Sequence, residues 1–599
     1  MKPTDINNPE YFHKVVDCQY ACPAHTPVPQ YIRLIAEGKY SEAYMINWDS
    51  NVFPGVLGRT CDRPCEPACR RGRLADEEPV AICRLKRVAA DNKDEVKSMM
   101  PKAPFVSNGK KVALIGGGPA SLTVARDLAP QGYEIHLYEE QKKAGGFMRS
   151  QIPDFRLPET VLDEEVNFVL DLGIHTHFNQ YVNSLKELLS KDYDAVFVGS
   201  GAPKGKDLPN LEGRNEGAAN IHVGINWLAS VAFEHTKSIG KNVLVLGGGN
   251  TAMDCCRTAR RLGGENVKVV VRSPFAEMKA SPWEKEDAQH EDIPILDNHV
   301  PKSFVTENGK LVGMTFEKVT AVYDENGKRS LVPTGEPDVF LEADDVLIAI
   351  GQENSFPWIE RDLGIEFDKW EMPIVNETTF VSTNPKVFFG GDAAFGPKNV
   401  ITAVAHGHQA AISIDLFCQG KDLVNDRPSP FVNLVSQKMG IHEWSYDNNV
   451  VNDSRYVVPQ LEKELTLKSL KKEVELGFDL SQGFKEAERC LNCDIQTVFT
   501  ETKCIECDAC VDICPTSCIS FVPNQESEEE LRTVLKAPSN NKSQELYVSE
   551  TLKTQRVMVK DENVCLHCGL CAERCPTSAW DMQKFFYNIT KAGNKIYSK

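Results

Sequence analysis

The residues whose type and spacing indicate chemistry most directly are the cysteines, of which this 599-residue chain has 20. Six lie between residues 18 and 83 and eleven between residues 490 and 575, whereas residues 84–489 contain only three. Residues 1–10 lack the apolar core of an export signal, so we expect a cytoplasmic, reducing location in which disulfides are rare. Clustered cysteines in such a chain are typical of metal ligands.

The C-terminal cysteines form two copies of one spacing pattern. Cys504-x2-Cys507-x2-Cys510-x3-Cys514-Pro is followed by the same pattern starting at Cys565. In a two-cluster ferredoxin domain the close triplet binds one [4Fe–4S] cluster, and the fourth cysteine binds the other. The expected ligand sets are Cys504, Cys507, Cys510 and Cys575 for one cluster, and Cys514, Cys565, Cys568 and Cys571 for the other. Two zinc sites are the alternative, but zinc does not explain the repeated Cys-Pro ending. Cys518 lies outside the pattern and is interpreted as a spare thiol.

Two glycine-rich turns indicate dinucleotide binding. Gly116-Gly-Gly118 follows an apolar run at 111–115 and precedes a helical pattern at 120–130. Glu139 ends the next strand, where an acidic residue can bind a ribose hydroxyl. Ser121 stands where a third glycine is usual. Taken alone, such a turn has a plain glycine-rich loop as its alternative.

The second turn, Gly247-Gly-Gly249-Asn-Thr, also lies between a strand-like run and a helical run. Two such sites in one chain suggest a flavin and a nicotinamide. Arg272 ends the following strand and Lys279 lies nearby, so cations stand where a 2′-phosphate would lie, and NADPH is favoured over NADH. A merely solvated Arg272 is the alternative.

The elements that must position these motifs are mostly of the α/β type. Apolar runs predict buried strands of parallel sheets at 111–115, 134–138, 194–199, 243–246, 267–272 and 345–350. The chain is too long for one core, so we expect several domains. Their predicted bounds are 1–108 (helical iron–sulfur), 109–239 and 351–420 (FAD-binding), 240–350 (NAD(P)H-binding), 421–489 (surface connector) and 490–599 (α+β ferredoxin-like). The connector is expected to contain one amphipathic helix near 460–476.

Several further motifs are shared with a known family. They are Cys22-Pro, Cys61-x3-Cys65-Glu-x2-Cys69, Ile152-Pro-Asp-Phe-Arg-Leu-Pro158, Glu277-Met278, Gly390-Gly-Asp392 and Glu486-Ala-Glu-Arg-Cys490-Leu-Asn-Cys493. With these motifs, residues 15–495 resemble the small chain of glutamate synthase and its relatives. These relatives include the N-terminal half of dihydropyrimidine dehydrogenase and the NADPH-binding subunit of bifurcating transhydrogenases. The resemblance implies two Rossmann-like domains arranged as in disulfide reductases.

The glycine motifs and the resemblance together give a set of expected cofactor residues. For FAD they are Gly116, Gly118, Pro119, Ala120, Ser121, Glu139, Gly146, Arg156, Gly391, Asp392, Asn399 and Ile401. For NAD(P)H they are Gly247, Gly249, Asn250, Thr251, Ala252, Arg272 and Lys279. The helix at 400–416 is expected to point its positive end at the flavin. No side chain is expected to act as a general acid or base, and His406, His408 and His567 are expected to be structural or solvated.

The resemblance also implies two clusters in the N-terminal domain. Relatives bind one cluster with the cysteine before proline and a later triplet, which correspond here to Cys22, Cys61, Cys65 and Cys69. The second cluster lacks its usual upstream Cys-x2-Cys pair. We therefore expect Cys18 and Cys83 to be joined by Cys490 and Cys493. The alternative is that the last two belong with the ferredoxin domain and only three clusters form. Cys255, Cys256 and Cys418 are expected to be inert.

These parts predict an enzyme, an NAD(P)H-dependent FAD/iron–sulfur oxidoreductase. It would pass hydride from NAD(P)H to FAD, and single electrons through four [4Fe–4S] clusters to, or reversibly from, a partner protein or ferredoxin. Flavin-based bifurcation and a non-enzymatic relay are the alternatives, and the adjacent Cys255-Cys256 pair argues against a thiol–disulfide reductase. The net charge of −18 without a long basic run argues against nucleic acid. No apolar run predicts a membrane span. We expect a subunit of a hetero-oligomer.

Overall fold

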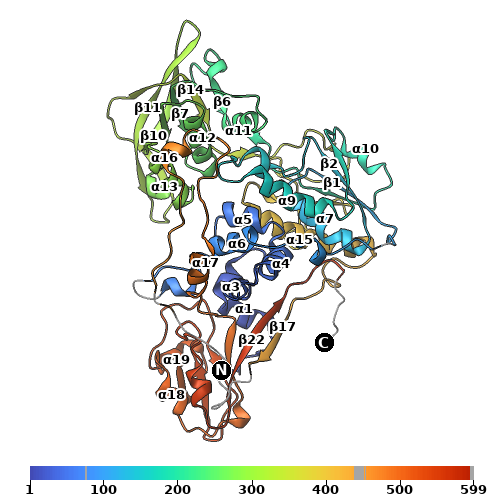
Figure 1. The fold of residues 1–599 in the computed structure, drawn as a ribbon, viewed down its shortest axis with the longest axis vertical. Helices are drawn as coiled ribbons and strands as arrows, with labels where there is room; N and C mark the ends of the chain where they lie inside the picture. Colours follow the sequence, from blue (N-terminus) through green and yellow to red (C-terminus); the bar gives the residue numbers. More distant parts are fainter. Residues whose placement is uncertain (74–76, 105, 438–450, 452, 594–599) are drawn as a thin grey trace.

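The computed structural model describes residues 1–73, 77–104, 106–437, 451 and 453–593. In Figure 1 the N-terminal helices lie at the centre, with two α/β units above them and the C-terminal unit below. Part of the predicted connector, at 438–450 and 452, lies outside the described residues. Among the described residues, no helix combines the length and apolarity needed to cross a membrane.

The N-terminal unit is a compact group of short helices. They are α1 (Pro9–Val15), α2 (Asp17–Ala21), α3 (Val28–Ala36), α4 (Tyr40–Asn51), α5 (Pro54–Thr60) and α6 (Ile82–Asp91). Proline near the first position starts α3 and α5, where its missing N–H leaves no bond unmade. A Cβ at Gly58 would lie 2.9 Å from the Cα of Arg87, so α5 and α6 meet by their backbones. This close packing brings the cysteines after α5 near Cys83, the single cysteine of α6.

The first α/β unit is a five-stranded parallel sheet in the order β16-β4-β1-β2-β3. Its strands are β1 (Lys111–Ile115), β2 (Glu134–Glu139), β3 (His175–Phe178), β4 (Ala195–Val198) and β16 (Val387–Phe389). Helix α7 (Pro119–Leu128) follows β1 and packs against α15 (Val400–Cys418). Because β16 returns from far along the chain, the turns after β1 and β16 meet at one end of the sheet.

The second α/β unit is inserted between β4 and β16. Its parallel sheet has the order β6-β14-β7-β8-β9. The strands are β6 (Ile221–Val223), β7 (Asn242–Leu246), β8 (Asn266–Val270), β9 (Ile295–Leu296) and β14 (Asp345–Ile348), with α11 (Gly224–Ala232), α12 (Asn250–Arg261) and α13 (Pro282–His290). An antiparallel sheet joins β10 (His299–Glu307), β11 (Lys310–Tyr323), β12 (Arg329–Pro333) and β13 (Val339–Glu342). The expected fold class is confirmed by both sheets.

The C-terminal unit contains two small antiparallel sheets. One has the order β17-β22-β18 and joins β17 (Phe431–Ser436), β18 (Ile495–Phe499) and β22 (Trp580–Asn588). The other joins β19 (Ile519–Pro523), β20 (Tyr547–Val548) and β21 (Arg556–Lys560), with α18 (Ala509–Ile513), α19 (Glu528–Thr533) and α20 (Leu570–Arg574) nearby. Strand β17 comes from the predicted connector, so that segment is partly built into a sheet.

The predicted helix near 460–476 is wrong. Only the four-residue α16 (Lys463–Thr466) forms there, and the chain around it is irregular, with an antiparallel bridge between Gln460 and Glu475. Tertiary ion pairs override the helical pattern, because Glu473 contacts Arg59 at 2.7 Å and Arg87 at 2.9 Å. The chain then re-enters the N-terminal unit as α17 (Leu480–Ala487), just before Cys490.

Candidate functional site

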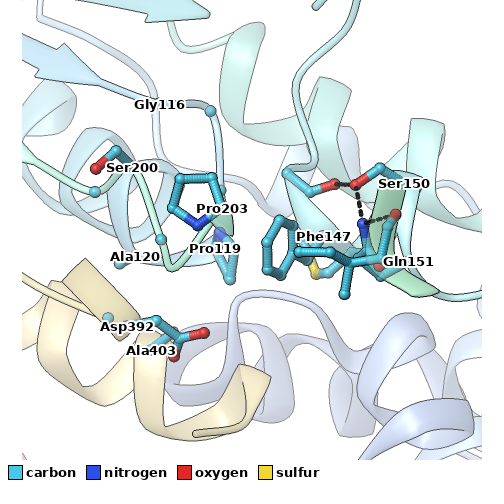
Figure 2. Close-up of a pocket in the computed structure, with 18 of the residues that line it drawn as sticks. Gly116, Pro119, Ala120, Phe147, Ser150, Gln151, Ser200, Pro203, Asp392 and Ala403 are labelled. Carbon is cyan, nitrogen blue, oxygen red and sulfur yellow. Dashed lines mark hydrogen bonds between the residues drawn. The ribbon is translucent and has the colours of Figure 1, made fainter. Parts of the chain in front are cut away.

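A cavity of about 640 Å³ lies where the two α/β units and the N-terminal unit meet. Residues of three turns line it: Gly116–Ala120 after β1, Gly390–Asp392 after β16, and Asn250 and Thr251 at the start of α12. In Figure 2, Gly116, Pro119 and Ala120 lie on one side, with Asp392 and Ala403 on another. The cavity therefore contacts both predicted nucleotide-binding turns at once.

The turn after β1 has the geometry of a dinucleotide site. Gly116 has φ +87°, and a Cβ there would lie 2.8 Å from the carbonyl oxygen of Gly199. The Gly117 N–H donates to Glu139 Oε2 at 2.6 Å, and the Gln141 N–H donates to Oε1 at 2.8 Å. Burial raises the pKa of Glu139. The Glu139 carboxylate thus holds the backbone of the turn in place by hydrogen bonds and also lines the cavity.

The turn after β16 contributes the opposite wall. Asp392 lines the cavity, its Oδ1 accepts from the Lys398 N–H at 3.0 Å, and burial raises its pKa. Asn399 caps α15, with its Oδ1 accepting from the Thr402 N–H at 3.0 Å. Since the N-terminus of a helix carries partial positive charge, this end of α15 favours an anionic group in the cavity.

Buried polar atoms without partners show that the cavity suits a polar ligand. Among the described residues, Ser200 Oγ and Gln151 Oε1 are buried and have no hydrogen-bond partner, and both residues line the cavity. Such atoms are costly unless a ligand or water satisfies them. Ser121 fills space that an ordinary turn leaves for glycine: a Cβ at Gly199 would lie 2.2 Å from its Oγ. Serine is therefore tolerated at position 121 because the residue opposite it, after the end of β4, is Gly199.

The expected FAD residues are distributed as follows. Those that line the cavity are Gly116, Gly118, Pro119, Ala120, Glu139, Gly146, Arg156, Gly391, Asp392 and Asn399. Ser121 and Ile401 are buried in α7 and α15 and do not line it. The guanidinium of Arg156 is held by Asp254 at 2.6 Å and by Glu284, so it also joins the two α/β units.

The second glycine turn contributes less to this cavity. Of the expected NAD(P)H residues, only Asn250 and Thr251 line it, whereas Gly247, Gly249, Ala252, Arg272 and Lys279 lie outside its lining. A Cβ at Gly249 would meet nothing within 4 Å, so the turn is open. Arg272 and Lys279 are exposed and form no ion pair with a described residue. Glu277 between them is paired with Arg329 at 2.6 Å.

Two residues that sequence reasoning missed are Thr60 and Asp62. They flank Cys61 and line the same cavity as the two glycine turns. Asp62 Oδ1 accepts from the Asn250 side chain at 3.3 Å, and the guanidinium of Arg63 stacks on Trp283 of the second unit with 4.0 Å to the ring centre. No sequence signal marks these contacts, although the adjacency to Cys61 is visible in the sequence.

The C-terminal cysteines gather as their spacing predicts. Cys504, Cys507, Cys510 and Cys575 line one small cavity, which we name the outer ferredoxin group. Cys514, Cys565, Cys568 and Cys571 line another, the inner ferredoxin group. Cys518 also lines the second cavity, with its Sγ 3.5 Å from Cys514 Sγ. The spare thiol is thus adjacent to an expected ligand.

The N-terminal cysteines gather differently from the expectation. Cys18, Cys69, Cys490 and Cys493 line one cavity, which we name the bridging group. Cys83 is not at this cavity. Instead the thiol of Cys83 lies next to the thiols of Cys61 and Cys65, and Cys22 is the fourth cysteine of this set, which we name the flavin-side group. The expected sets therefore exchange Cys69 and Cys83. The reason is that α6 packs on α5 and turns Cys83 toward Cys61, while Cys69 ends its loop beside Cys490.

Recurrent loop geometry shows that these groups suit iron–sulfur clusters. The second residue after Cys61, Cys490, Cys504 and Cys565 has positive φ in each case, at Arg63, Asn492, Glu506 and His567. Its N–H donates to the preceding sulfur at 3.4 Å for Cys61, 3.3 Å for Cys504 and 3.4 Å for Cys565. Non-glycine residues seldom adopt this backbone conformation. Loops that curl around a thiolate and donate N–H groups to it are suited to holding a metal cluster.

The other predicted cysteines and histidines are buried or half-buried in the structure. Cys255 and Cys256 are buried in α12, where burial raises the pKa of each thiol, and burial raises that of Cys418 to about 12. His408 contacts Asp127 at 2.5 Å and the Ser50 carbonyl at 3.0 Å. His567 is buried against Arg70. Burial lowers the pKa of His406 to about 4.

Comparisons with known proteins agree with this site. Residues 110–407 match the pyridine nucleotide-disulphide oxidoreductase family, residues 12–98 match dihydropyrimidine dehydrogenase domain II with its 4Fe-4S cluster, and residues 503–579 match the 4Fe-4S dicluster domain. The NADP(+)-dependent formate dehydrogenase subunit beta of Moorella thermoacetica is 35% identical, over 80% of this chain and 70% of that one. The NADPH-Fe(3+) oxidoreductase subunit beta of Geobacter sulfurreducens is 32% identical, over 82% and 77%. The glutamate synthase [NADPH] small chain of Escherichia coli is 32% identical, over 66% and 87%.

Fold, site and relatives define an NAD(P)H-dependent flavin and iron–sulfur oxidoreductase. Its cofactors are FAD, [4Fe–4S] clusters and NADP(H). Within that class, the chain belongs to the glutamate synthase small-chain-like family and carries an additional C-terminal ferredoxin domain.

Proposed function

We propose that this chain is the electron-input subunit of a hetero-oligomer. It takes hydride from NADPH onto FAD and delivers single electrons to a partner protein through four [4Fe–4S] clusters. FAD supplies the conversion between two-electron hydride transfer and one-electron transfer. The beta-subunit names of two relatives support a partner subunit. The six domain bounds expected from the sequence, the four clusters and the four cysteine groups as their ligand sets are part of this proposal.

The observation that carries the proposal is the composition of one cavity. The flavin-type turn at Gly116–Ala120, the start of α12 at Asn250 and the loop around Cys61 all line it. A nicotinamide, an isoalloxazine ring and the first cysteine group can therefore meet in one place. Such contiguity is what electron input requires, because each transfer must occur between neighbouring sites.

The four cysteine groups also follow one another from this cavity toward the C-terminal unit. Tyr31 donates to the carbonyl oxygen of Ile82 at 3.3 Å, and Ile82 both precedes Cys83 of the flavin-side group and lines the cavity of the bridging group. Arg70, next to Cys69, donates to the carbonyl oxygen of Cys565 at 3.0 Å, which joins the bridging and inner ferredoxin groups. The two ferredoxin groups share the α18–α20 contact.

The outer ferredoxin group is the proposed exit to the partner. Cys507 is exposed, and Ile505 beside it is 57% exposed. Among the sixteen cysteines proposed as ligands, all of which the structure describes, every one except Cys507 is buried or half-buried. A partner that docks over Cys507 would lie next to the last of the four cysteine groups on the proposed electron path.

The first experiment is an anaerobic titration of purified holoprotein. About sixteen iron atoms and one FAD per chain, with flavin and cluster absorbance bleached by substoichiometric NADPH, are expected for four cubane clusters. About twelve irons would remove one cluster from the proposal. Flavin that dithionite reduces but NADPH does not would contradict the electron-input role and leave only a relay.

The preference for NADPH is proposed to come from Arg272 and Lys279. Replacing both with alanine removes two cations from the expected 2′-phosphate position. The Michaelis constant for NADPH should rise about tenfold to a hundredfold, because charge-assisted bonds contribute about 1.5–3 kcal/mol. The constant for NADH should change little. Lys310→Ala, at an exposed lysine in β11, is the control. Equal losses for both nucleotides would contradict the assignment.

A further inference from the structure

We propose that the buried ammonium of Lys86 raises the reduction potential of the cluster held by the flavin-side group. This inference rests on the proposed ligand set Cys22, Cys61, Cys65 and Cys83. By this effect, one side chain would favour electron transfer from the reduced flavin to the first cluster. Neither the sequence motifs nor the relatives indicate this role.

Lys86 lies on α6 and is only 4% exposed. Its Nζ donates to Asn51 Oδ1 at 3.1 Å. No carboxylate of a described residue lies within ion-pair distance of it. A buried ammonium with only a neutral partner is strongly unfavourable unless another anion compensates it.

The groups that surround this ammonium are the sulfurs of one cysteine group. Cys83 lies three residues earlier on the same helix, so the two side chains share a helix face. Cys83, Cys61, Cys65 and Cys22, which are all four members of the flavin-side group, lie within electrostatic range of the Lys86 ammonium. The compensating anion is therefore the set of thiolates itself, loaded with its cluster.

The direction of the effect follows from charge alone. The cluster gains one negative charge when it accepts one electron from the reduced flavin, and no other covalent change is needed. A fixed cation nearby stabilises the more negative, reduced form. Cluster potentials respond to net local charge and burial in this way. Lys86 therefore makes the first cluster a better electron acceptor.

Among the described residues, none of the other cysteine groups has an equivalent buried and unpaired ammonium beside it. Arg70 beside the bridging group is paired with Asp17 at 3.2 Å. Lys560, near Cys565 of the inner ferredoxin group, is paired with Glu562 at 2.9 Å. At the outer ferredoxin group, Glu506 is paired with Arg556 at 3.3 Å, and Lys503 beside Cys504 is exposed to solvent. Paired charges largely cancel, so we expect the flavin-side cluster to have a higher potential than the outer one.

The test is an anaerobic redox titration of holoprotein with mediators, in which each reduced cluster is followed by electron paramagnetic resonance. Lys86→Met should lower the midpoint of one cluster and leave the others unchanged. At a fixed potential, its ratio of reduced to oxidised form should fall at least tenfold, which corresponds to 59 mV for one electron. Lys86→Arg should keep the charge and retain most of the wild-type midpoint.

A second variant tests the same charge without removing the lysine. Asn51→Asp is nearly isosteric and places a carboxylate beside Lys86 Nζ, so it should also lower the midpoint of that one cluster. Iron content checks that four clusters remain in each variant. Unchanged midpoints in both Lys86→Met and Asn51→Asp would overturn the proposal, as would an upward shift. The titration uses dithionite and mediators, so it remains informative even if NADPH reduction itself fails.

Discussion

The two pairs of cysteine groups are built on different principles. Each ferredoxin group takes three cysteines from one local run and the fourth from its sequence repeat, as with Cys504–Cys510 and Cys575. The bridging group instead collects Cys18, Cys69, Cys490 and Cys493 from three distant segments. Local groups are specified by backbone geometry within one loop. The bridging group exists only because α17 returns the chain to the N-terminal unit.

The difference explains why the structure groups Cys69 and Cys83 differently from the expectation. Spacing alone places the C-terminal cysteines, because a Cys-x2-Cys loop can curl around only one metal site. Cys69 and Cys83 each follow other cysteines at distances that several sites would accommodate. Their grouping depends on the direction in which α6 faces, and Gly58 permits the close contact of α5 with α6 that sets this direction.

The largest expected effect comes from the cysteines themselves. Cys69→Ser and Cys490→Ser should each remove the same cluster, so the double variant should lose about four irons, no more than either single variant. Cys83→Ser combined with Cys490→Ser should lose about eight. Iron analysis of the four proteins measures this directly. If Cys69→Ser with Cys490→Ser loses about eight irons instead, the exchange of Cys69 and Cys83 is incorrect.

A smaller effect, on the free energy of unfolding, is expected at Arg70, which connects the N-terminal unit to the C-terminal unit. Its guanidinium is 5% exposed and contacts Asp17 together with backbone carbonyls of Val15 and Cys565. Arg70→Met should lower the free energy of unfolding by about 1.5–3 kcal/mol, because it removes a buried charged donor from Asp17 and from two backbone carbonyls, although Arg73 still pairs with Asp17. Denaturant unfolding, followed by loss of cluster absorbance, provides the measurement.

Arg73 offers a matched control for this prediction, since it binds the same carboxylate at 2.7 Å but its side chain is 35% exposed. Arg73→Ala should change the stability by no more than about 1 kcal/mol. Equal effects of the two substitutions would show that the contact between the two units does not depend on the buried guanidinium of Arg70.

The smallest expected effect is a pH dependence of the stability of the contact between the N-terminal unit and the C-terminal unit. His13 is buried, stacks on Tyr587 of β22 with ring centres 4.0 Å apart, and contacts His25 at 3.2 Å. Burial, and then the neighbouring His25, lower the pKa of His13 to about 3. The unfolded value is about 6.5, so the unfolded state binds more protons between these values. The stabilisation is therefore full above about pH 6.5 and is lost as the pH falls.

Hydrogen exchange of β22 amides can measure this pH dependence. Protection, corrected for intrinsic exchange, should fall by about 2 kcal/mol between about pH 7.5 and pH 5. In His13→Phe the fall should be much smaller, because the stacking surface remains without the titrating ring. A variant that keeps the full pH dependence would place the responsible group elsewhere.

Much of the fold was predictable because its signals are local. The run 111–115 became β1 with the expected bounds, and the glycines after it form the predicted turn. The helix expected at 400–416 became α15. By contrast, the helical pattern at 460–476 was misleading, since Glu473 and Glu475 are bound by arginines of the N-terminal unit. Local propensity is weak enough for such contacts to override it.

The sequence by itself determined the two nucleotide turns, the ferredoxin repeat and the class of cofactor, because each depends on residues a few positions apart whose backbone geometry is nearly fixed by their type. Only the tertiary structure decided that Thr60 and Asp62 line the same cavity as the glycine turns, that Cys69 lies with Cys490, and that the buried Lys86 has the amide of Asn51 and no described carboxylate as its partner. These contacts join segments far apart in the chain. Their selection depends on close packing and on the need to compensate buried charge, which no local spacing encodes.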